Sequence, residues 1–187
     1  EKHKNFFGFE ASVAGGIPII KTLKESLILN EIREIYAILN GTSNYILSNM
    51  SKLKISFNDA LKDAQDKGYA ESNPTLDING EDSAHKLSIL NSIIFSEIPS
   101  FKSIHVRGIE NIELIDHHHS SEFGYNIRLI ALSHITDNGV YKEVTPMLVD
   151  KYSSLGRVDE ANNIIKIIGR ESGDVVLEGQ GAGEGPT

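Results

Sequence analysis

Hydrophobic residues in the first half of the chain recur at intervals of three and four, which predicts amphipathic helices. The four predicted helices carry Ile20, Leu23 and Leu27; Tyr45, Ile46 and Met50; Ala60, Leu61 and Ala64, within Phe57 to Lys67; and Ala84, Leu87, Leu90 and Ile94, within Asp82 to Phe95. Between the first two, residues 32–39 alternate well enough for a strand whose two faces are both apolar. Such a strand is expected to be buried on both faces or to cover a partner.

The second half of the chain is rich in strand-forming residues. Five segments, residues 104–109, 125–135, 140–149, 162–171 and 174–181, are separated by polar turns that contain glycine. The turn Asp137-Asn138-Gly139 between two of these segments predicts a β-hairpin. Together with the strand at 32–39, they predict an α+β fold in which a mixed β-sheet of about five or six strands carries helices on one face.

Residues that begin and end helices sharpen these boundaries. Ser56 is the predicted N-cap of the third helix and Gly68 ends it, while Asn79 is the predicted N-cap of the fourth. Before the first helix, a strand-like segment at residues 6–13 runs into Gly15 and Gly16. These two glycines permit unusual backbone angles, and a simple strand-to-helix turn explains them as well as a binding loop does.

Composition narrows the possible functions. A chain of 187 residues with 40% hydrophobic and 24% charged residues is typical of a single globular domain. The net charge of −8 argues against a nucleic acid or anionic membrane partner. No apolar run approaches a membrane span of roughly 20 residues, and no cysteine is present for a disulfide, a thiolate nucleophile or a sulfur-ligated zinc. We therefore expect a cytoplasmic protein.

The most distinctive polar residues lie in the stretch GYAESNPTLDINGEDSAHKLSIL, residues 68–90. It places Glu71, Asp77 and Asp82 beside Lys86 where an irregular segment meets a helix, so that Asp82 and Lys86 share one helix face. A lysine next to carboxylates can transfer a proton while the carboxylates bind an amine. An Asp/Lys pair at this spacing is also common on solvated helix faces, where it contributes only about 0.2–0.5 kcal/mol.

Three other polar segments contain residue types that are found in ligand, metal or nucleotide sites. Asn40-Gly41-Thr42, between a predicted strand and a helix, is either a plain turn or a loop whose backbone N–H groups face a ligand. His117, His118 and His119 cannot all point the same way on a regular element, so we expect a solvated helix end or loop rather than a metal site. The glycines of GQGAGEG, residues 179–185, do not have the spacing of a dinucleotide-binding loop.

Four segments in order, FEASVAGGIPII, ILNGTSNYIL, GYAESNPTLDINGEDSAHK and GQGAGEGPT, resemble the homoserine dehydrogenase family and span nearly the whole chain. The third is similar to the family pattern G-Y-x-E-x-D-P-x-x-D-x-x-G-x-D-x-x-x-K. The chain departs from that pattern at Asn73, where the family commonly has Asp, which puts a charge-based role at this position in doubt.

The resemblance implies an NAD(P)-dependent interconversion of aspartate semialdehyde and homoserine, in the biosynthesis of threonine, methionine and isoleucine. It also assigns roles to residues. The implied catalytic residues are Lys86, as proton donor, and Asp77; the substrate-binding residues are Glu71, Asp82, Thr42 and Tyr69; the residues near the cofactor are Gly68 and Gly181; and the oxygen ligands of a monovalent cation, sodium or potassium, come from Glu10, Val13, Gly15 and Ile17.

Nothing in the sequence supplies the βαβ nucleotide-binding unit with which the family's polypeptide begins. We therefore expect residues 1–187 to be the substrate-binding, catalytic and dimerisation domain of a longer enzyme, inactive alone. A homodimer through the sheet is expected because residues 127–135 and 164–168 are apolar at adjacent positions and one helical layer cannot cover both faces. The alternatives are a non-catalytic amino-acid-binding or dimerisation module derived from this fold, and a dehydrogenase acting on another amino-acid aldehyde.

Overall fold

The computed structural model describes residues 8–181 and confirms the α+β fold with a mixed six-stranded sheet. The strand order is β2-β4-β3-β1-β5-β6; β2 runs parallel to β4, and the other neighbouring strands are antiparallel. The strands are β1 Ile32–Ile38, β2 His105–Val106, β3 Tyr125–Thr136, β4 Gly139–Asp150, β5 Asn162–Gly169 and β6 Gly173–Gln180. The helices are α1 Ile19–Lys21, α2 Gly41–Leu53, α3 Phe57–Asp66, α4 Thr75–Ile78, α5 Glu81–Ile94, α6 Leu114–Glu122 and α7 Ser154–Arg157.

The predicted hairpin is confirmed and forms the longest ladder of the sheet. β3 and β4 pair from Tyr125 opposite Asp150 to Thr136 opposite Gly139, so only Asp137 and Asn138 form the turn. Gly139 has a φ of +115° at the start of the returning strand. A two-residue turn matches the twist of antiparallel strands, which explains why this part of the fold could be located from the sequence.

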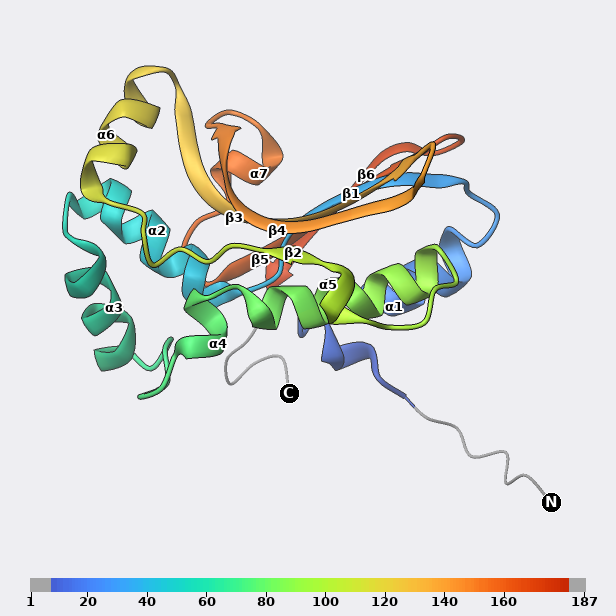
Figure 1. Ribbon diagram of the computed structural model, residues 1–187, viewed down its shortest axis with the longest axis horizontal. Coiled ribbons are helices and arrows are strands. Elements are labelled where there is room, and N and C mark those ends of the chain that lie inside the picture. The colour runs from blue at the N-terminus through green and yellow to red at the C-terminus, as the bar shows by residue number, and fades with distance from the viewer. Residues whose placement is uncertain (1–7, 182–187) are drawn as a thin grey trace.

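The sheet separates two unequal apolar layers. In Figure 1, α1, α4 and α5 lie below the sheet, where most of the core is found. Ile35 and Ala37 of β1 point into this main core, and Ile38 points to the other face, where it joins a smaller cluster that includes Leu155 of α7. The strand at 32–39 is therefore buried on both faces, as expected. The helical layer lies mainly on one face, with α7 on the other.

The end of α3 is held by the glycine that the sequence predicted. Gly68 has a φ of +78°, its N–H donates to the Gln65 carbonyl at 3.0 Å, and the Tyr69 N–H donates to the Ala64 carbonyl at 2.8 Å. This is a Schellman motif, which satisfies carbonyls that the helix leaves without partners. At the other end, Ser56 is the N-cap, as predicted. The chain leaves α3 in a fixed direction toward Tyr69.

Three predicted boundaries were wrong. Residues 10–12 form a 3-10 helix rather than part of a strand, and residues 6–7 lie outside the described range. The N-cap of α5 is Gly80, at a φ of +86°, rather than Asn79, although Asn79 Oδ1 still accepts the Glu81 N–H at 2.9 Å. Of the segment 104–109, only His105–Val106 forms a strand.

The histidine segment is a helix, and its first histidine is not solvated. His117 in α6 is 1% exposed, so the expectation of a solvated helix end or loop is wrong for this residue; His118 and His119 are exposed. A helix turns about 100° per residue, so three consecutive side chains face different directions. Burial, followed by the neighbouring positive charge of Arg128, lowers the pKa of His117 to about 4. Within residues 8–181, no three His, Asp or Glu side chains converge as a metal site would require.

Across residues 8–181, none of the helices is both long and apolar enough to cross a membrane.

Candidate active site

Elements from both halves of the chain meet around a cavity of about 530 Å³. The contributing segments are the end of β1, the start of α2, the loop after α3, α4 with the first turns of α5, the start of β5 and the residue that follows β6. The lining residues are Leu39, Asn40, Gly41, Thr42, Lys67, Gly68, Tyr69, Asp77, Asp82, Lys86, Ala161, Asn163 and Gly181. They include every residue that the sequence assigned to catalysis, substrate or cofactor, except Glu71.

Lys86 is held at the first turns of α5 by two acceptors. Its Nζ donates to Asp82 Oδ2 at 2.7 Å and to the Leu39 backbone carbonyl at 3.1 Å. The two side chains are 24% and 29% exposed, so this pair is not the freely solvated face that was the alternative. The ammonium group is thus tethered at the cavity wall, and water still has access to it.

Asp77 approaches the same group from α4. Burial raises the pKa of the Asp77 carboxyl, and the negative charges of Asp82 and Glu71 act in the same direction. The hydrogen bond from Asn40 and the charge of Lys86 oppose this shift. A carboxyl group in a cavity with a pKa shifted by burial and by named charges is a common property of functional sites.

Thr42 of α2 and Tyr69 of the loop after α3 form another wall of the cavity. Thr42 Oγ1 donates to the Tyr69 carbonyl at 2.6 Å, which ties the start of α2 to the loop after α3. The Tyr69 ring lies 4.5 Å from that of Tyr45, whose hydroxyl donates to Asp63 and accepts a hydrogen bond from Lys67 Nζ at 2.9 Å. Tyr69 is 44% exposed, so its ring is both supported and accessible to a ligand.

Glu71 is not brought to the cavity wall. It is exposed, and its backbone carbonyl accepts a hydrogen bond from Gln65 Nε2 at 3.1 Å. Its negative charge nevertheless contributes to the raised pKa of Asp77, so Glu71 acts on the site without lining the cavity.

Asn73 serves the local turn. Its Oδ1 accepts a hydrogen bond from Thr75 Oγ1 at 2.6 Å and a longer one from the Thr75 N–H at 3.4 Å. An asparagine supplies this acceptor as well as an aspartate does, so the turn before α4 does not need the missing charge.

The segment that was expected to hold a cation adjoins the site. Ala14 and Gly15 both have left-handed backbone angles, with φ of 57° and 51°. A Cβ on Gly15 would collide with the backbone carbonyl of Gly181, so a glycine is required at this contact. The Glu10 carboxylate accepts the N–H groups of Ile20 and Lys21 at 2.7 and 2.9 Å, which ties this segment to the start of α1. At the other end of the chain, Gly183 and Gly185 lie outside the described residues.

Three polar residues of the cavity wall had no assigned role from the sequence. Asn40 donates to both Asp77 and Asp82. Asn163 of β5 donates to the Leu39 carbonyl at 3.3 Å, the acceptor that Lys86 also uses. Lys67 joins Tyr45 and Asp63. The only signal in the sequence was the position of Asn40 at the end of a strand, where it could cap the following helix.

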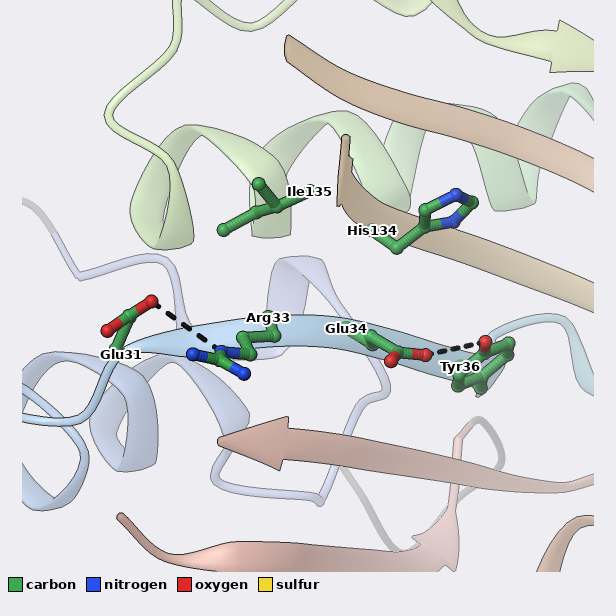
Figure 2. Close-up of a pocket in the computed structure, with 6 residues that line it drawn as sticks. All are labelled: Glu31, Arg33, Glu34, Tyr36, His134 and Ile135. Carbon is green, nitrogen blue, oxygen red and sulfur yellow. Dashed lines mark hydrogen bonds and ion pairs between the residues drawn. The ribbon is translucent and has the colours of Figure 1, made fainter. Parts of the chain in front are cut away.

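A second hollow, of about 570 Å³, lies over β1 and β3 and is shown in Figure 2. Glu34, Tyr36 and His134 line it, and Tyr36 donates a hydrogen bond to Glu34 at 2.7 Å. Tyr36 belongs to the smaller apolar layer, so this hollow is on the face of the sheet opposite the main helical layer. It is separate from the carboxylate and lysine cluster.

Comparisons with known proteins point to one family. Residues 18–187 match the model of the family described as "Homoserine dehydrogenase". A homoserine dehydrogenase of Helicobacter pylori is 48% identical over 180 residues, and one of Neisseria gonorrhoeae is 40% identical over 187 residues. These alignments cover 96% and 100% of this chain but 43% of each relative, so the chain spans about two-fifths of the proteins it matches.

Solved structures show the same fold. A homoserine dehydrogenase from Thiobacillus denitrificans aligns with a TM-score of 0.93 at 43% identity, covering 95% of this chain and 41% of that one. A hyperthermophilic archaeal homoserine dehydrogenase mutant, solved in complex with NADPH, aligns with a TM-score of 0.79 at 29% identity over 96% of this chain and 51% of its own.

Proposed function

Because the chain belongs to the homoserine dehydrogenase family, we propose that it forms the substrate-binding and proton-transfer part of an NAD(P)-dependent homoserine dehydrogenase that acts in amino-acid biosynthesis. The observation that carries this proposal is the cluster of Asp77, Asp82 and Lys86 in one cavity with Gly181. A tethered lysine beside carboxylates suits a reaction in which an amino acid is bound and one proton moves.

The reaction that we propose reduces the aldehyde group of aspartate semialdehyde to the primary alcohol of homoserine. The nicotinamide, when bound, supplies the hydride that reaches the aldehyde carbon. Lys86 gives a proton to the aldehyde oxygen and takes it back in the reverse direction. Asp82 and the Leu39 carbonyl keep the lysine Nζ at the cavity wall for this transfer.

Binding of the amino acid falls to the acidic residues. Asp82 and Glu71 attract the ammonium group, and Asp77 sets the charge around Lys86. Thr42 and Tyr69 shape the wall from α2 and the loop after α3. Support comes from the cavity lining for four of these five residues and, for Glu71, from its electrostatic effect on Asp77.

The cofactor assignment rests on one relative. NADPH is bound by the archaeal relative, and this chain aligns with about half of that protein. We propose NADP or NAD as the cofactor, with Gly68 and Gly181 beside its reactive end and the main nucleotide site in a domain outside residues 1–187. A cytoplasmic location, expected from the sequence, belongs to the same proposal.

We also propose a sodium or potassium ion on oxygens of Glu10, Val13, Gly15 and Ile17, mostly from the backbone. Hard monovalent cations prefer oxygen ligands, and the consecutive left-handed residues Ala14 and Gly15 turn the backbone sharply in this segment. Because Gly15 contacts Gly181, a bound ion would fix the loop against which Gly181 packs and so affect the active site.

The test is an absorbance assay at 340 nm with NAD(P)H and aspartate semialdehyde on the full-length enzyme, and with the 187-residue chain alone. Turnover by the full-length enzyme and none by the chain alone supports the proposal. Faster turnover with another amino-acid aldehyde would identify a different dehydrogenase. Homoserine binding by calorimetry with no turnover in either form would favour the non-catalytic module.

A further inference from the structure

We propose that Asn40 is a positioning residue of the active site: its side-chain amide holds the carboxylates of Asp77 and Asp82 together beside Lys86. This inference rests on the proposed function. Asn40 is the second residue after β1 and directly precedes α2, and it is 5% exposed. The sequence placed it in a plain turn or in a loop whose backbone N–H groups face a ligand, and assigned no role to its side chain.

The geometry uses all of the polar atoms of the side chain. Asn40 Nδ2 donates to Asp77 Oδ1 at 2.6 Å and to Asp82 Oδ2 at 2.8 Å, while Asn40 Oδ1 accepts the Ser43 N–H at 2.8 Å. An amide has two hydrogens and one carbonyl oxygen, so this is a full match between the group and its surroundings. The two donors must face the carboxylates, because the carbonyl oxygen faces a backbone N–H.

The helix cap fixes the amide before any ligand arrives. Asn40 is the N-cap of α2, and Ser43 Oγ donates to the Asp77 backbone carbonyl at 2.6 Å. Through Ser43, the first turn of α2 therefore fixes both the Asn40 side chain and the backbone of Asp77. Groups that are ordered in the folded protein before substrate binds favour catalysis, because no further entropy is lost in orienting them during the reaction.

The bridge also leaves atoms for the substrate. Asp82 Oδ2 accepts from both Asn40 and Lys86, and Asp77 accepts through Oδ1. Among the hydrogen bonds of residues 8–181, the second oxygen of each carboxylate is not used, so both can accept from an ammonium or hydroxyl group in the cavity.

An asparagine suits position 40 because the charges around Asp77 have opposite effects on its ionisation. Asp77 faces Asp82 and Lys86 on α5 and Glu71 on the loop before α4, and Lys67 lines the cavity from the end of α3. Two carboxylates close together disfavour double ionisation. A neutral donor that bonds to both charged forms offsets this repulsion without adding a charge, and its hydrogen bond lowers the pKa of Asp77 against the effect of burial.

Two substitutions separate the bridge from the cap. Asn40→Ser and Asn40→Asp both keep an oxygen that accepts the Ser43 N–H. The serine removes the amide donors, and the aspartate replaces them with a third carboxylate. In the full-length enzyme, reducing aspartate semialdehyde, Asn40→Ser should move the acidic limb of the kcat/KM profile upward by about one pH unit or more, the size expected for a lost hydrogen bond to a charged group. Asn40→Asp should move it further.

The shape of the profile decides between positioning and structure. We expect the activity of Asn40→Ser to return to within about threefold of wild type at high pH, where Asp77 is ionised in both proteins. A loss that is equal at every pH, or an unshifted acidic limb, overturns the inference. Ser56→Ala removes the N-cap of α3, away from the carboxylates, and serves as the control that lowers Tm without moving the profile.

Failure of the proposed function is distinguishable from failure of this inference, since it would appear as inactivity of the wild-type enzyme with aspartate semialdehyde. In that case, ¹³C NMR titration of the Asp77 carboxyl in wild-type protein and in Asn40→Ser tests the bridge directly. A midpoint that rises in the variant supports it, and coincident titrations overturn it. Asn40→Thr, which also keeps the cap oxygen, replaces Asn40→Ser if the serine variant does not fold.

Discussion

The Lys86 ammonium group and the Asp82 carboxylate, four residues apart on α5, form a 2.7 Å ion pair that points into the cavity. On an exposed helix such a pair has little effect on stability. Here the Leu39 carbonyl, 47 residues away in sequence, accepts from the same Nζ. Two acceptor atoms, one on α5 and one on the residue that follows β1, therefore fix the position of the Lys86 Nζ.

Replacing Lys86 should abolish most of the chemistry. Lys86→Ala in the full-length enzyme should lower kcat by roughly 10²–10⁴-fold with a modest change in KM, the usual effect of removing a general acid. Steady-state kinetics with NAD(P)H and aspartate semialdehyde measure this. Lys62→Ala, on the exposed face of α3, is the matched control and should be unaffected. Turnover of Lys86→Ala within about threefold of wild type would remove Lys86 from the mechanism.

Glu71 should affect binding rather than chemistry. Because Glu71 is exposed and its charge acts on Asp77, Glu71→Gln should raise KM for homoserine by several-fold, with kcat nearly unchanged. The control is Glu122→Gln, which removes an exposed carboxylate of α6. A fall in kcat at constant KM would contradict this role.

The ionised Asp77 carboxylate should lower the stability of the folded protein, although it supports the activity. Its pKa is raised in the folded protein, mainly by burial, so the folded state holds the proton more tightly than the unfolded state does. Stability therefore falls as pH rises from the ordinary carboxyl pKa through the raised one, and it stays lower above that window. Asp77→Asn keeps the acceptor for Asn40 without the charge.

Thermal unfolding checks this expectation. Asp77→Asn should raise Tm by a few degrees at pH 7, and the gain should disappear near about pH 3, where the wild-type carboxyl is protonated in both states. Activity should fall at the same time, as is common for charged active-site groups. A lower Tm at pH 7 would mean that the ionised Asp77 is net stabilising.

The parts of this fold that could be predicted depend on local patterns. The hairpin of β3 and β4 follows from the turn at 137–138, and α3 follows from its stripe, its Ser56 cap and Gly68. The positions that failed depend on contacts remote in sequence. The 3-10 turn at 10–12 is tied to the start of α1 by the Glu10 carboxylate, which bonds to N–H groups 10 and 11 residues away.

The same distinction holds for the site. Asp82 and Lys86 could be paired from their spacing, and motif resemblance added Asp77, Thr42 and Gly181. Asn40 could not be placed, because its two carboxylate partners are 37 and 42 residues away and local pattern shows only a turn. Its role needed the packing of α2 against α4, which a periodicity argument does not reach.

His117 should make the protein sensitive to acid. It faces Arg128, Asp116 and Lys54, and neither of its ring nitrogens has a hydrogen-bond partner within residues 8–181. Because its pKa is lowered from 6.5 to about 4, the unfolded state binds the proton first, and stability falls as pH drops from about 6.5 to about 4. The loss is at most roughly 3 kcal/mol.

His117→Leu should remove much of that loss without lowering stability at pH 7, since no hydrogen bond is given up. Urea unfolding between pH 4 and pH 7 compares the variant with wild type. His118→Gln, at an exposed neighbour, should keep the wild-type pH dependence. If the wild-type free energy of unfolding is flat from pH 6.5 to 4, His117 binds its proton equally in the folded and unfolded states and does not make the protein sensitive to acid.

The face of the sheet opposite the main helical layer is only partly covered. α7 and Val158 cover the part of it formed by Ile130 and Ile164. Val176 of the edge strand β6 is 42% exposed there, and the hollow of Figure 2 opens on the same face beside Tyr36.

A second copy of the chain, packed over this uncovered part, would bury it symmetrically. A stable interface needs about 800 Å² per partner. Light scattering at micromolar concentration should therefore report a dimer for the wild-type protein. Val176→Asp should weaken the dimer at least tenfold, because a charge would be buried without a partner. Ile98→Asp, at a 90% exposed apolar residue outside the sheet, is the control and should remain dimeric. A monomeric wild type would refute the dimer, and an unchanged Val176→Asp dimer would show that the copies meet through another surface.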